Sequence, residues 1–174
     1  GAKEEERIGF DCSIWRLHPV TRKFEIVCRG TTNPWGHDWD EMGELFFTGN
    51  VNGHLWHAVP GALFPRMGDR ADPFVKYDYA RMPMTANHLH HAGTIKEWTQ
   101  SRDAKGIHGD LGGGHSHCGG MIYLGDNWPD KYRGRIFMCN THGKRLNQNI
   151  IERHGSAYVG KRAPDPFNAG WGWF

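Results

Sequence analysis

Four short segments that follow one another decide the fold: GGMIYLG (119–125), GRIFMCN (134–140), KRLNQNIIER (144–153) and SAYVGKR (156–162). Each segment contains β-branched or aromatic residues, and glycine or polar residues stand between one segment and the next. This pattern is typical of strands joined by turns. The four segments therefore predict an antiparallel meander of four strands.

The amino-terminal part of the chain carries further strand patterns. We expect a hairpin with strands at about 12–18 and 23–28, then strands at about 36–40 and 44–48, and a third in GHLWHAV (53–59). Glycine, proline, asparagine and aspartate interrupt the chain every few residues, which argues against long helices and excludes a helix bundle.

A weak repeat links the two halves. GELFFTGN (43–50) and GRIFMCN (134–140) are similar in type, and each follows a polar turn after another strand. Repeated four-stranded meanders are typical of β-propellers, whose blades run about 40–50 residues. We therefore expect an all-β chain that is part of a β-propeller, with about two to three four-stranded blades. A β-sandwich or barrel has the same strand content.

The predicted domain organisation is a single partial propeller over residues 1–174, with an irregular insertion at about 65–118. Of the 174 residues 24 are glycine, which is about double the usual share, and 13 % are aromatic, too many for a disordered chain. The formal net charge of +2 gives no reason to expect a nucleic-acid partner. The chain has no run of about 18 apolar residues, which is the length that a membrane-spanning helix needs.

The four cysteines leave two interpretations open. If 119–124 pairs with 134–139, Leu124 lies opposite Gly134 and Cys118 opposite Cys139, at a distance that a disulfide can bridge. Cys12 and Cys28 fall near the open end of the first hairpin. Two cross-strand disulfides would indicate an oxidising compartment, whereas four buried free thiols would be ordinary core residues.

Seven of the twelve histidines gather in three places. These are His88, His90 and His91; His108, His115 and His117; and His142. Alternate residues of a strand share a face, so His115 and His117 could converge, with His142 nearby. Converging imidazoles suit zinc, copper or iron, and a single one suits a general base.

The other five histidines are interpreted as structural groups. His18, His37 and His154 are isolated, and His54 and His57 are three residues apart, on opposite sides of one strand. The same structural interpretation stays open for the three clusters. The tryptophan and phenylalanine residues are interpreted as packing between blades.

Two stretches carry a family resemblance: GTTNPWGHDWDEMGELFFTGNVNGHLWHAVPG (30–61) and HSHCGGMIYLGDNWPDKYRGRIFMCNTHGKRLNQNIIERHGSAYVGK (115–161). Together they cover about half of the chain. They resemble the membrane-bound dehydrogenase propellers of planctomycetes and verrucomicrobia, which are similar to glucose/sorbosone dehydrogenases. The resemblance implies a six-bladed propeller that is exported, and hence a periplasmic or extracellular location.

The resemblance also implies a chemistry. Soluble glucose dehydrogenases of this superfamily use pyrroloquinoline quinone and calcium to oxidise a sugar or polyol. A histidine removes the hydroxyl proton while hydride passes to the quinone. That histidine lies in a His-x-Gly-Gly motif, which HCGG matches here with His117 as the catalytic residue.

The same resemblance assigns the cofactor-binding residues. The family holds its quinone with an Arg-Asn-Pro-x-Gly turn; TNPWG matches it with Asn33, while Thr32 stands in place of the arginine. Apart from the resemblance, Arg145 is predicted to bind the cofactor. The converging imidazoles of His115, His117 and His142 are predicted to hold a metal, either calcium or a histidine-bound transition metal.

The chain departs from the soluble enzymes at two further points. Ser116 precedes His117 where those enzymes have a carboxylate, and the HCGG motif follows the NPWG motif instead of preceding it. Two functions therefore follow as hypotheses. One is a sugar or polyol dehydrogenase-like propeller, and the other is a non-catalytic propeller that binds a carbohydrate or protein with at most a structural metal.

The expected partners are a small sugar or polyol and the rest of the propeller. A partial ring leaves unpaired strand edges, so the chain is expected to associate with the remainder of its own protein or with copies of itself.

Overall fold

The computed structural model describes residues 3–51, 53–76, 80–87 and 116–169. Within these residues the regular structure consists of strands and three short 3₁₀ turns, with no α-helix. No helix in this part of the chain is long and apolar enough to cross a membrane. The strands are β1 (Ser13–Leu17), β2 (Phe24–Arg29), β3 (Pro34–Trp39), β4 (Leu45–Gly49), β5 (Leu55–His57), β6 (His117–Ile122), β7 (Arg135–Asn140), β8 (Arg145–His154) and β9 (Ala157–Asn168).

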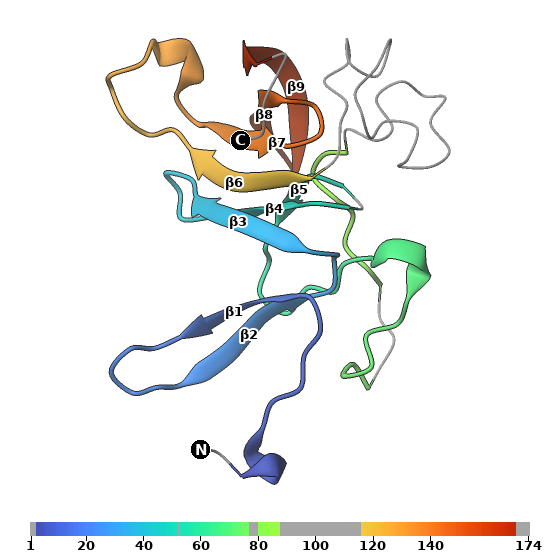
Figure 1. Cartoon of the computed structure of the whole chain (residues 1–174). Coiled ribbons are helices and arrows are strands. Elements are labelled where there is room, and N and C mark those ends of the chain that lie inside the picture. The colour runs from blue at the N-terminus through green and yellow to red at the C-terminus, as the bar shows by residue number, and fades with distance from the viewer. Residues whose placement is uncertain (1–2, 52, 77–79, 88–115, 170–174) are drawn as a thin grey trace.

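The strands form three antiparallel sheets in the order of the sequence. β1 pairs with β2, β3–β4–β5 form a second sheet, and β6–β7–β8–β9 form a third. The sheets lie one above another along the molecule (Figure 1). The predicted meander and the upstream strands are thus confirmed, with ends displaced by a few residues.

A short segment of the predicted insertion at 65–118 pairs with the last strand of the second sheet. Ala86 forms a β-bridge with Leu55, and the Thr85 amide donates to the Leu55 carbonyl over 2.9 Å. The 3₁₀ turn η2 (Met67–Asp69) also lies in the predicted insertion. Residues 88–115 of that insertion lie outside the described residues.

Strand β4 contacts the sheets on both of its sides. Phe46 packs with Ile122, Ile136 and Met138 of the third sheet. The next residue, Phe47, packs on the opposite face with Cys28 of the first sheet. Both phenylalanines are fully buried, because successive residues of a strand point to opposite faces.

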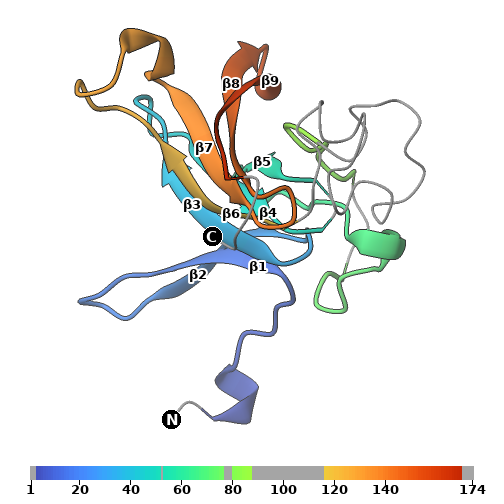
Figure 2. The same ribbon diagram turned by 45° about the horizontal axis from the view of Figure 1, so that its top comes forward.

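The first strands of the second and third sheets, β3 and β6, run side by side (Figures 1 and 2). The Ile122 amide of β6 donates to Asp38 Oδ2 of β3 over 2.8 Å. At Gly36 the two backbones are so close that an added Cβ atom would lie 2.5 Å from the Gly120 nitrogen. Successive sheets packed face to face, with their first strands adjacent, form part of a β-propeller.

The structure contains no disulfide bond: all four cysteines are free. The predicted register is confirmed, since Cys118 does lie opposite Cys139. However, the register shifts between Cys118 and Met121, and such a bulge turns the strand where a bridge would need aligned Cβ atoms. Cys28 lies opposite Ile14 instead of Cys12, and its side chain is buried in the core.

A glycine pair tests the close approach of β3 and β6. Gly36 and Gly43 both have positive φ, at 104° and 81°, but nothing lies within 4 Å of a Cβ atom added to Gly43. We expect Gly43→Ala to lower the free energy of unfolding by about 1–2 kcal/mol through backbone strain. Gly36→Ala should cost about 1–3 kcal/mol more through overlap. Urea denaturation measures both, and equal losses would contradict the close contact.

A second prediction concerns Cys28. Burial raises the pKa of its thiol to about 12, so the thiolate fraction at pH 8 is on the order of 10⁻⁴. We expect iodoacetamide to leave Cys28 unmodified in the folded chain and to modify all four cysteines in guanidinium without reductant. Peptide mass spectrometry measures both. Native modification of Cys28 at the rate of half-buried Cys12, or only two thiols in guanidinium, would contradict the structure.

Candidate functional site

A line of backbone hydrogen bonds gathers the predicted site residues at one end of the sheets. The Asn50 amide donates to the Asn33 carbonyl over 3.2 Å, and the Ser116 amide donates to the Asn50 carbonyl over 3.1 Å. The Thr141 amide then donates to the Ser116 carbonyl over 3.1 Å. The segments before β3 and β6 and after β4 and β7 therefore meet. We call this the histidine end, because His117 follows Ser116.

His117, the first residue of β6, is buried with 3 % of its surface exposed. Its Nε2 lies 3.2 Å from Asn147 Oδ1 on β8. Asn140, the residue opposite His117 on β7, donates from Nδ2 to the same oxygen over 2.8 Å. Neighbouring strands thus hold the His117 ring through one amide oxygen.

The partners of Asn147 determine which nitrogen of His117 carries hydrogen. Asn147 Nδ2 donates to Asp165 Oδ1 over 2.6 Å, which orients the amide because a carboxylate oxygen accepts. Its Oδ1 must then accept from His117. Neutral His117 therefore carries its hydrogen on Nε2 and its basic lone pair on Nδ1.

Asp165, on β9, links this line to a buried cation. Its Oδ2 lies 3.0 Å from Arg145 Nη1, and each side chain is about 10 % exposed. Arg145 Nε donates to the Gly143 carbonyl over 2.9 Å. Asp165 also meets Arg162 at 3.4 Å. A buried carboxylate of this kind is stable because cations and an amide share its charge.

A second histidine lies against His117. The ring of His54, just before β5, is 4.9 Å from that of His117 between centroids. His54 is 1 % exposed, and its Nε2 lies 2.9 Å from Asn149 Oδ1. Each ring is thus held by an asparagine of β8. The structural interpretation of His54 is supported by these contacts, but the side chain also forms one wall of the His117 environment.

Backbone strain gathers at the histidine end. Among the described residues, non-glycine residues with positive φ include Thr31 (67°), Asn33 (48°), Ser116 (73°) and Lys144 (54°), all in its connections. Such conformations are sparsely populated and persist where the surrounding structure imposes them, often at functional sites. The Thr31 hydroxyl is also buried without a hydrogen-bond partner in the described part of the chain.

The predicted site residues are brought together only in part. Thr32 Oγ1 accepts from the Met67 amide over 3.1 Å, and exposed Asn33 belongs to the hydrogen-bonded line. Half-buried His142 lies in the turn between β7 and β8, and Arg145 begins β8. All four are at the histidine end. His115, His88, His90, His91 and His108 lie outside the described residues.

The described residues do not fit the expected cofactors. Arg145 is buried and paired with Asp165, so it presents no cation to an anionic quinone. Thr32 carries no charge. Across the described ranges, no three side chains of His, Cys, Asp or Glu are grouped to hold a metal.

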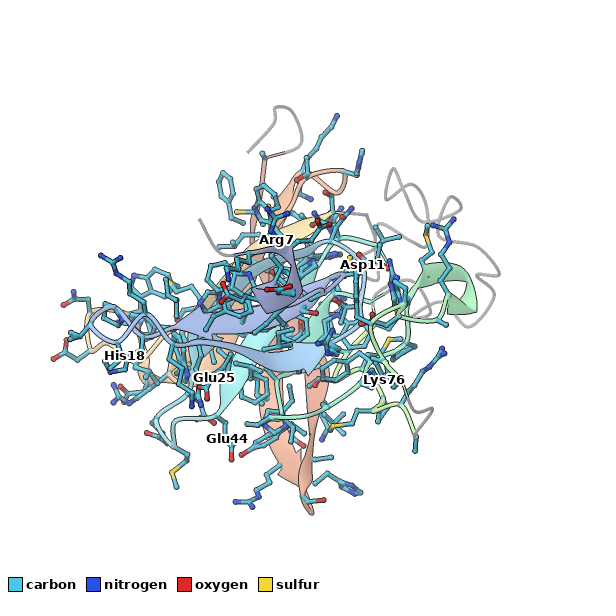
Figure 3. All side chains as sticks on the ribbon, turned by 90° about the horizontal axis from the view of Figure 1, so that it is seen from below. Arg7, Asp11, His18, Glu25, Glu44 and Lys76 are labelled. Atoms are coloured by element: carbon cyan, nitrogen blue, oxygen red, sulfur yellow. The ribbon has the colours of Figure 1, made fainter. Side chains whose placement is uncertain are left out.

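Three other histidines have local partners. His18 lies at the tip of the β1–β2 hairpin (Figure 3) and accepts the Thr21 amide at Nδ1 over 3.1 Å. His57 Nε2 lies 2.8 Å from Glu44 Oε2. The ring of His37 packs edge-on against Trp39. These contacts support the structural interpretation.

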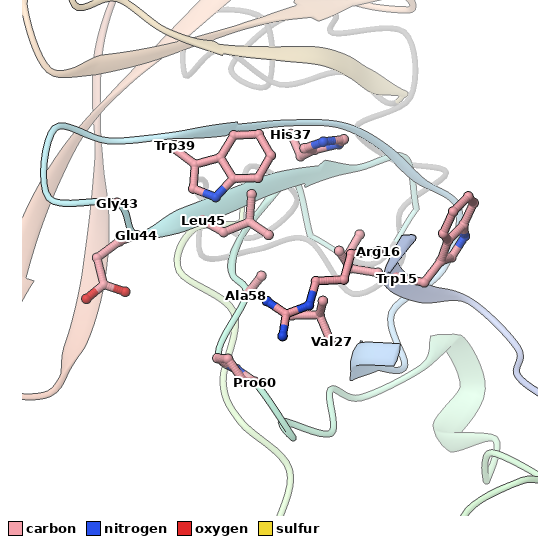
Figure 4. A pocket seen from close by; sticks show the side chains of 11 residues that line it. Trp15, Arg16, Val27, His37, Trp39, Gly43, Glu44, Leu45, Ala58 and Pro60 are labelled. Carbon is pink, nitrogen blue, oxygen red and sulfur yellow. The ribbon is translucent and has the colours of Figure 1, made fainter. Parts of the chain in front are cut away.

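A hollow of about 510 Å³ opens away from the histidine end, between the first hairpin and the second sheet. Figure 4 shows Trp39 of β3 on one side of it and Arg16 of β1 on the other. Its ionic groups are paired within the protein, since Arg16 contacts Glu25 and Glu44 contacts His57. None of the described residues predicted for a site lines it.

Sequence reasoning missed the polar partners of His117. Asn147, Gln148 and Asn149 are consecutive and all buried, although the buried positions of a strand are usually apolar. This run of amides was the available signal. Asp165 carried no signal, because it lies between two prolines in a segment without strand pattern.

Comparison with solved structures supports the propeller architecture. A candidate oxidoreductase (glucose dehydrogenase) from Thermus thermophilus aligns with a TM-score of 0.50 and 17 % identity. The alignment covers 83 % of this chain and 35 % of that one, so this chain spans about a third of that protein's length. At this identity the likeness shows the fold alone, which is that of a β-propeller.

The family is shown by the sequence. Residues 1–170 match the family described as domain of unknown function DUF7133, and the chain belongs to it. A comparison with curated proteins finds no match.

Removal of Asp165 tests the buried network. Asp165→Ala leaves Arg145 without its carboxylate and Asn147 Nδ2 without its acceptor, so we expect the free energy of unfolding to fall by about 3–5 kcal/mol. Glu152→Ala is the control, because it breaks an exposed pair with Lys161 and should cost at most about 1 kcal/mol. Urea denaturation measures both. Similar losses for the two variants would contradict the role of the network.

Proposed function

We propose that the histidine end is the substrate site of a sugar or polyol dehydrogenase-like propeller, with His117 as the general base. The line from His117 through Asn147 to Asp165 carries this proposal. The Asn147 amide oxygen orients the His117 ring, which supports its assignment as the base. The soluble enzymes have a carboxylate at the position of Ser116. Here the Asp165 carboxylate of β9, which contacts His117 through Asn147 of β8, would orient the ring instead.

In this proposal the His117 imidazole accepts the hydroxyl proton of the substrate. The Asp165 carboxylate, reached through Asn147, favours the positive charge that the ring then gains. Oxidation also requires a hydride acceptor, and pyrroloquinoline quinone with calcium or a histidine-bound metal is the proposed class. The described residues do not fit either group, since Arg145 is paired with Asp165 and no three of their His, Cys, Asp or Glu side chains are grouped to hold a metal.

The proposal extends to partners and location. Trp35 and Trp39 of β3 are 63 % and 49 % exposed. Exposed large aromatic side chains favour contact with another surface. We propose that the rest of its own propeller, or copies of the chain, cover these side chains, and that the protein works in the periplasm or outside the cell.

A second candidate is a non-catalytic propeller that binds a carbohydrate or protein. The burial of His117 favours it, since a ring with 3 % exposure and hydrogen-bonded partners is also typical of a structural histidine. In that case His117 would hold the loops of the histidine end in place.

Substitution of His117 distinguishes the two candidates. His117→Gln keeps an amide N–H that can donate to Asn147 but removes the base. We expect the rate of aldose oxidation to fall about 10²–10⁴-fold. The full-length protein is assayed with pyrroloquinoline quinone, calcium, a panel of aldoses and polyols, and a dye acceptor.

His154→Gln is the control, because His154 is exposed at the far end of β8. It should leave the rate unchanged. No turnover by the unsubstituted protein, or equal rates for the two variants, would contradict the catalytic proposal and favour the binding module.

A further inference from the structure

A second hollow, of about 600 Å³, opens at the opposite end of the third sheet from His117. Its walls come from the turn after β3, the segment before β7, the end of β8 and Tyr158 of β9. We call it the basic hollow, because the charged side chains that line it are Lys131, Arg133, Arg135 and Arg153, with Asp40 and Glu41 on the remaining wall.

The four cations of the basic hollow are held by neutral groups. Arg133 donates to the carbonyls of Leu124 and Gly125, and Arg153 donates to the Gly155 carbonyl. Arg135 donates to Gln148 Oε1 over 3.1 Å, and the Lys131 ammonium lies 4.9 Å from the centre of the Tyr132 ring.

None of these four forms an ion pair within the described residues, in contrast to Arg16, Arg145 and Lys161. Hydrogen bonds therefore orient the three guanidinium groups, and no carboxylate of the described residues forms an ion pair with any of the four cations. Guanidinium and ammonium groups arranged in this way recognise carboxylate, sulfate and phosphate oxygens.

The opposite wall of the basic hollow carries negative charge, from Asp40 and Glu41. Asp40 Oδ1 accepts the amides of Met42 and Glu44 over 3.0 and 2.8 Å, which fixes this carboxylate in the turn after β3. Burial, and then Glu44 and Asp40, raise the pKa of the Tyr158 phenol. A tyrosine hydroxyl group can donate a hydrogen bond to a ligand. A long polyanion would meet the carboxylates, whereas a ligand with one anionic group and several hydroxyl groups suits both walls.

We propose that the basic hollow binds a sugar acid. Its carboxylate would lie on the cations, and its hydroxyl groups would donate to Asp40 and Glu41. The volume lies within the range of about 300–1,000 Å³ that is usual for small-molecule sites. The proposal is independent of the role of His117, because the two sites are at opposite ends of β6–β9.

Isothermal titration calorimetry at low ionic strength tests this binding. Gluconate and glucuronate are titrated into the chain, beside glucose, sorbitol and acetate. We expect both sugar acids to bind more tightly than all three of these, and to bind more weakly as salt is added. Arg153→Gln and Lys131→Gln should each weaken binding about tenfold, because each removes a charged hydrogen-bond donor.

Matched variants separate the site from general charge. Lys161→Gln removes an equal charge outside the hollow, where Lys161 pairs with Glu152, and should leave binding unchanged.

Four results would overturn the proposal. These are no binding of either sugar acid, equal binding of glucose, equal weakening by Lys161→Gln and Arg153→Gln, or tighter binding of heparin or single-stranded DNA than of gluconate. The last would indicate a polyanion surface instead.

Discussion

The architecture depends on the burial of β4 from both sides. Phe46 and Phe47 are consecutive, yet one packs on the third sheet and the other on the first. A strand with water on one face would alternate polar and apolar residues, so this run requires sheets above and below. The stack of three sheets, and with it the approach of β3 to β6 at Gly36, follows from this requirement.

This stacking also assembles the histidine end. The segments that precede β3 and β6 and follow β4 and β7 meet because neighbouring sheets are aligned, and their amides and carbonyls pair from Asn33 to Thr141. The strained residues Asn33 and Ser116 lie in this line. Two buried asparagines of β8, Asn149 and Asn147, hold the rings of His54 and His117.

Much of the fold could be predicted because its signals are local. The four segments from 119 to 162 become β6–β9 in the expected order, and GELFFTGN and GRIFMCN become β4 and β7, each the second strand of its sheet. Of the two interpretations left open for the cysteines, the structure has the free thiols, although Cys118 does lie opposite Cys139, beside a bulge. The pairing of Thr85–Ala86 with Leu55 could not be predicted, because a segment of two residues is too short to show a strand pattern.

The sequence by itself determined the all-β class and the strand order, and its HCGG motif predicted a role for His117, because alternation, turns and a short motif are properties of neighbouring residues. Only the tertiary structure decided the surroundings of His117 and the pairing of Arg145 with Asp165. It likewise decided the gathering of four cations in the basic hollow. These contacts join residues far apart in the chain, and their partners are chosen by the packing of sheets and not by local sequence.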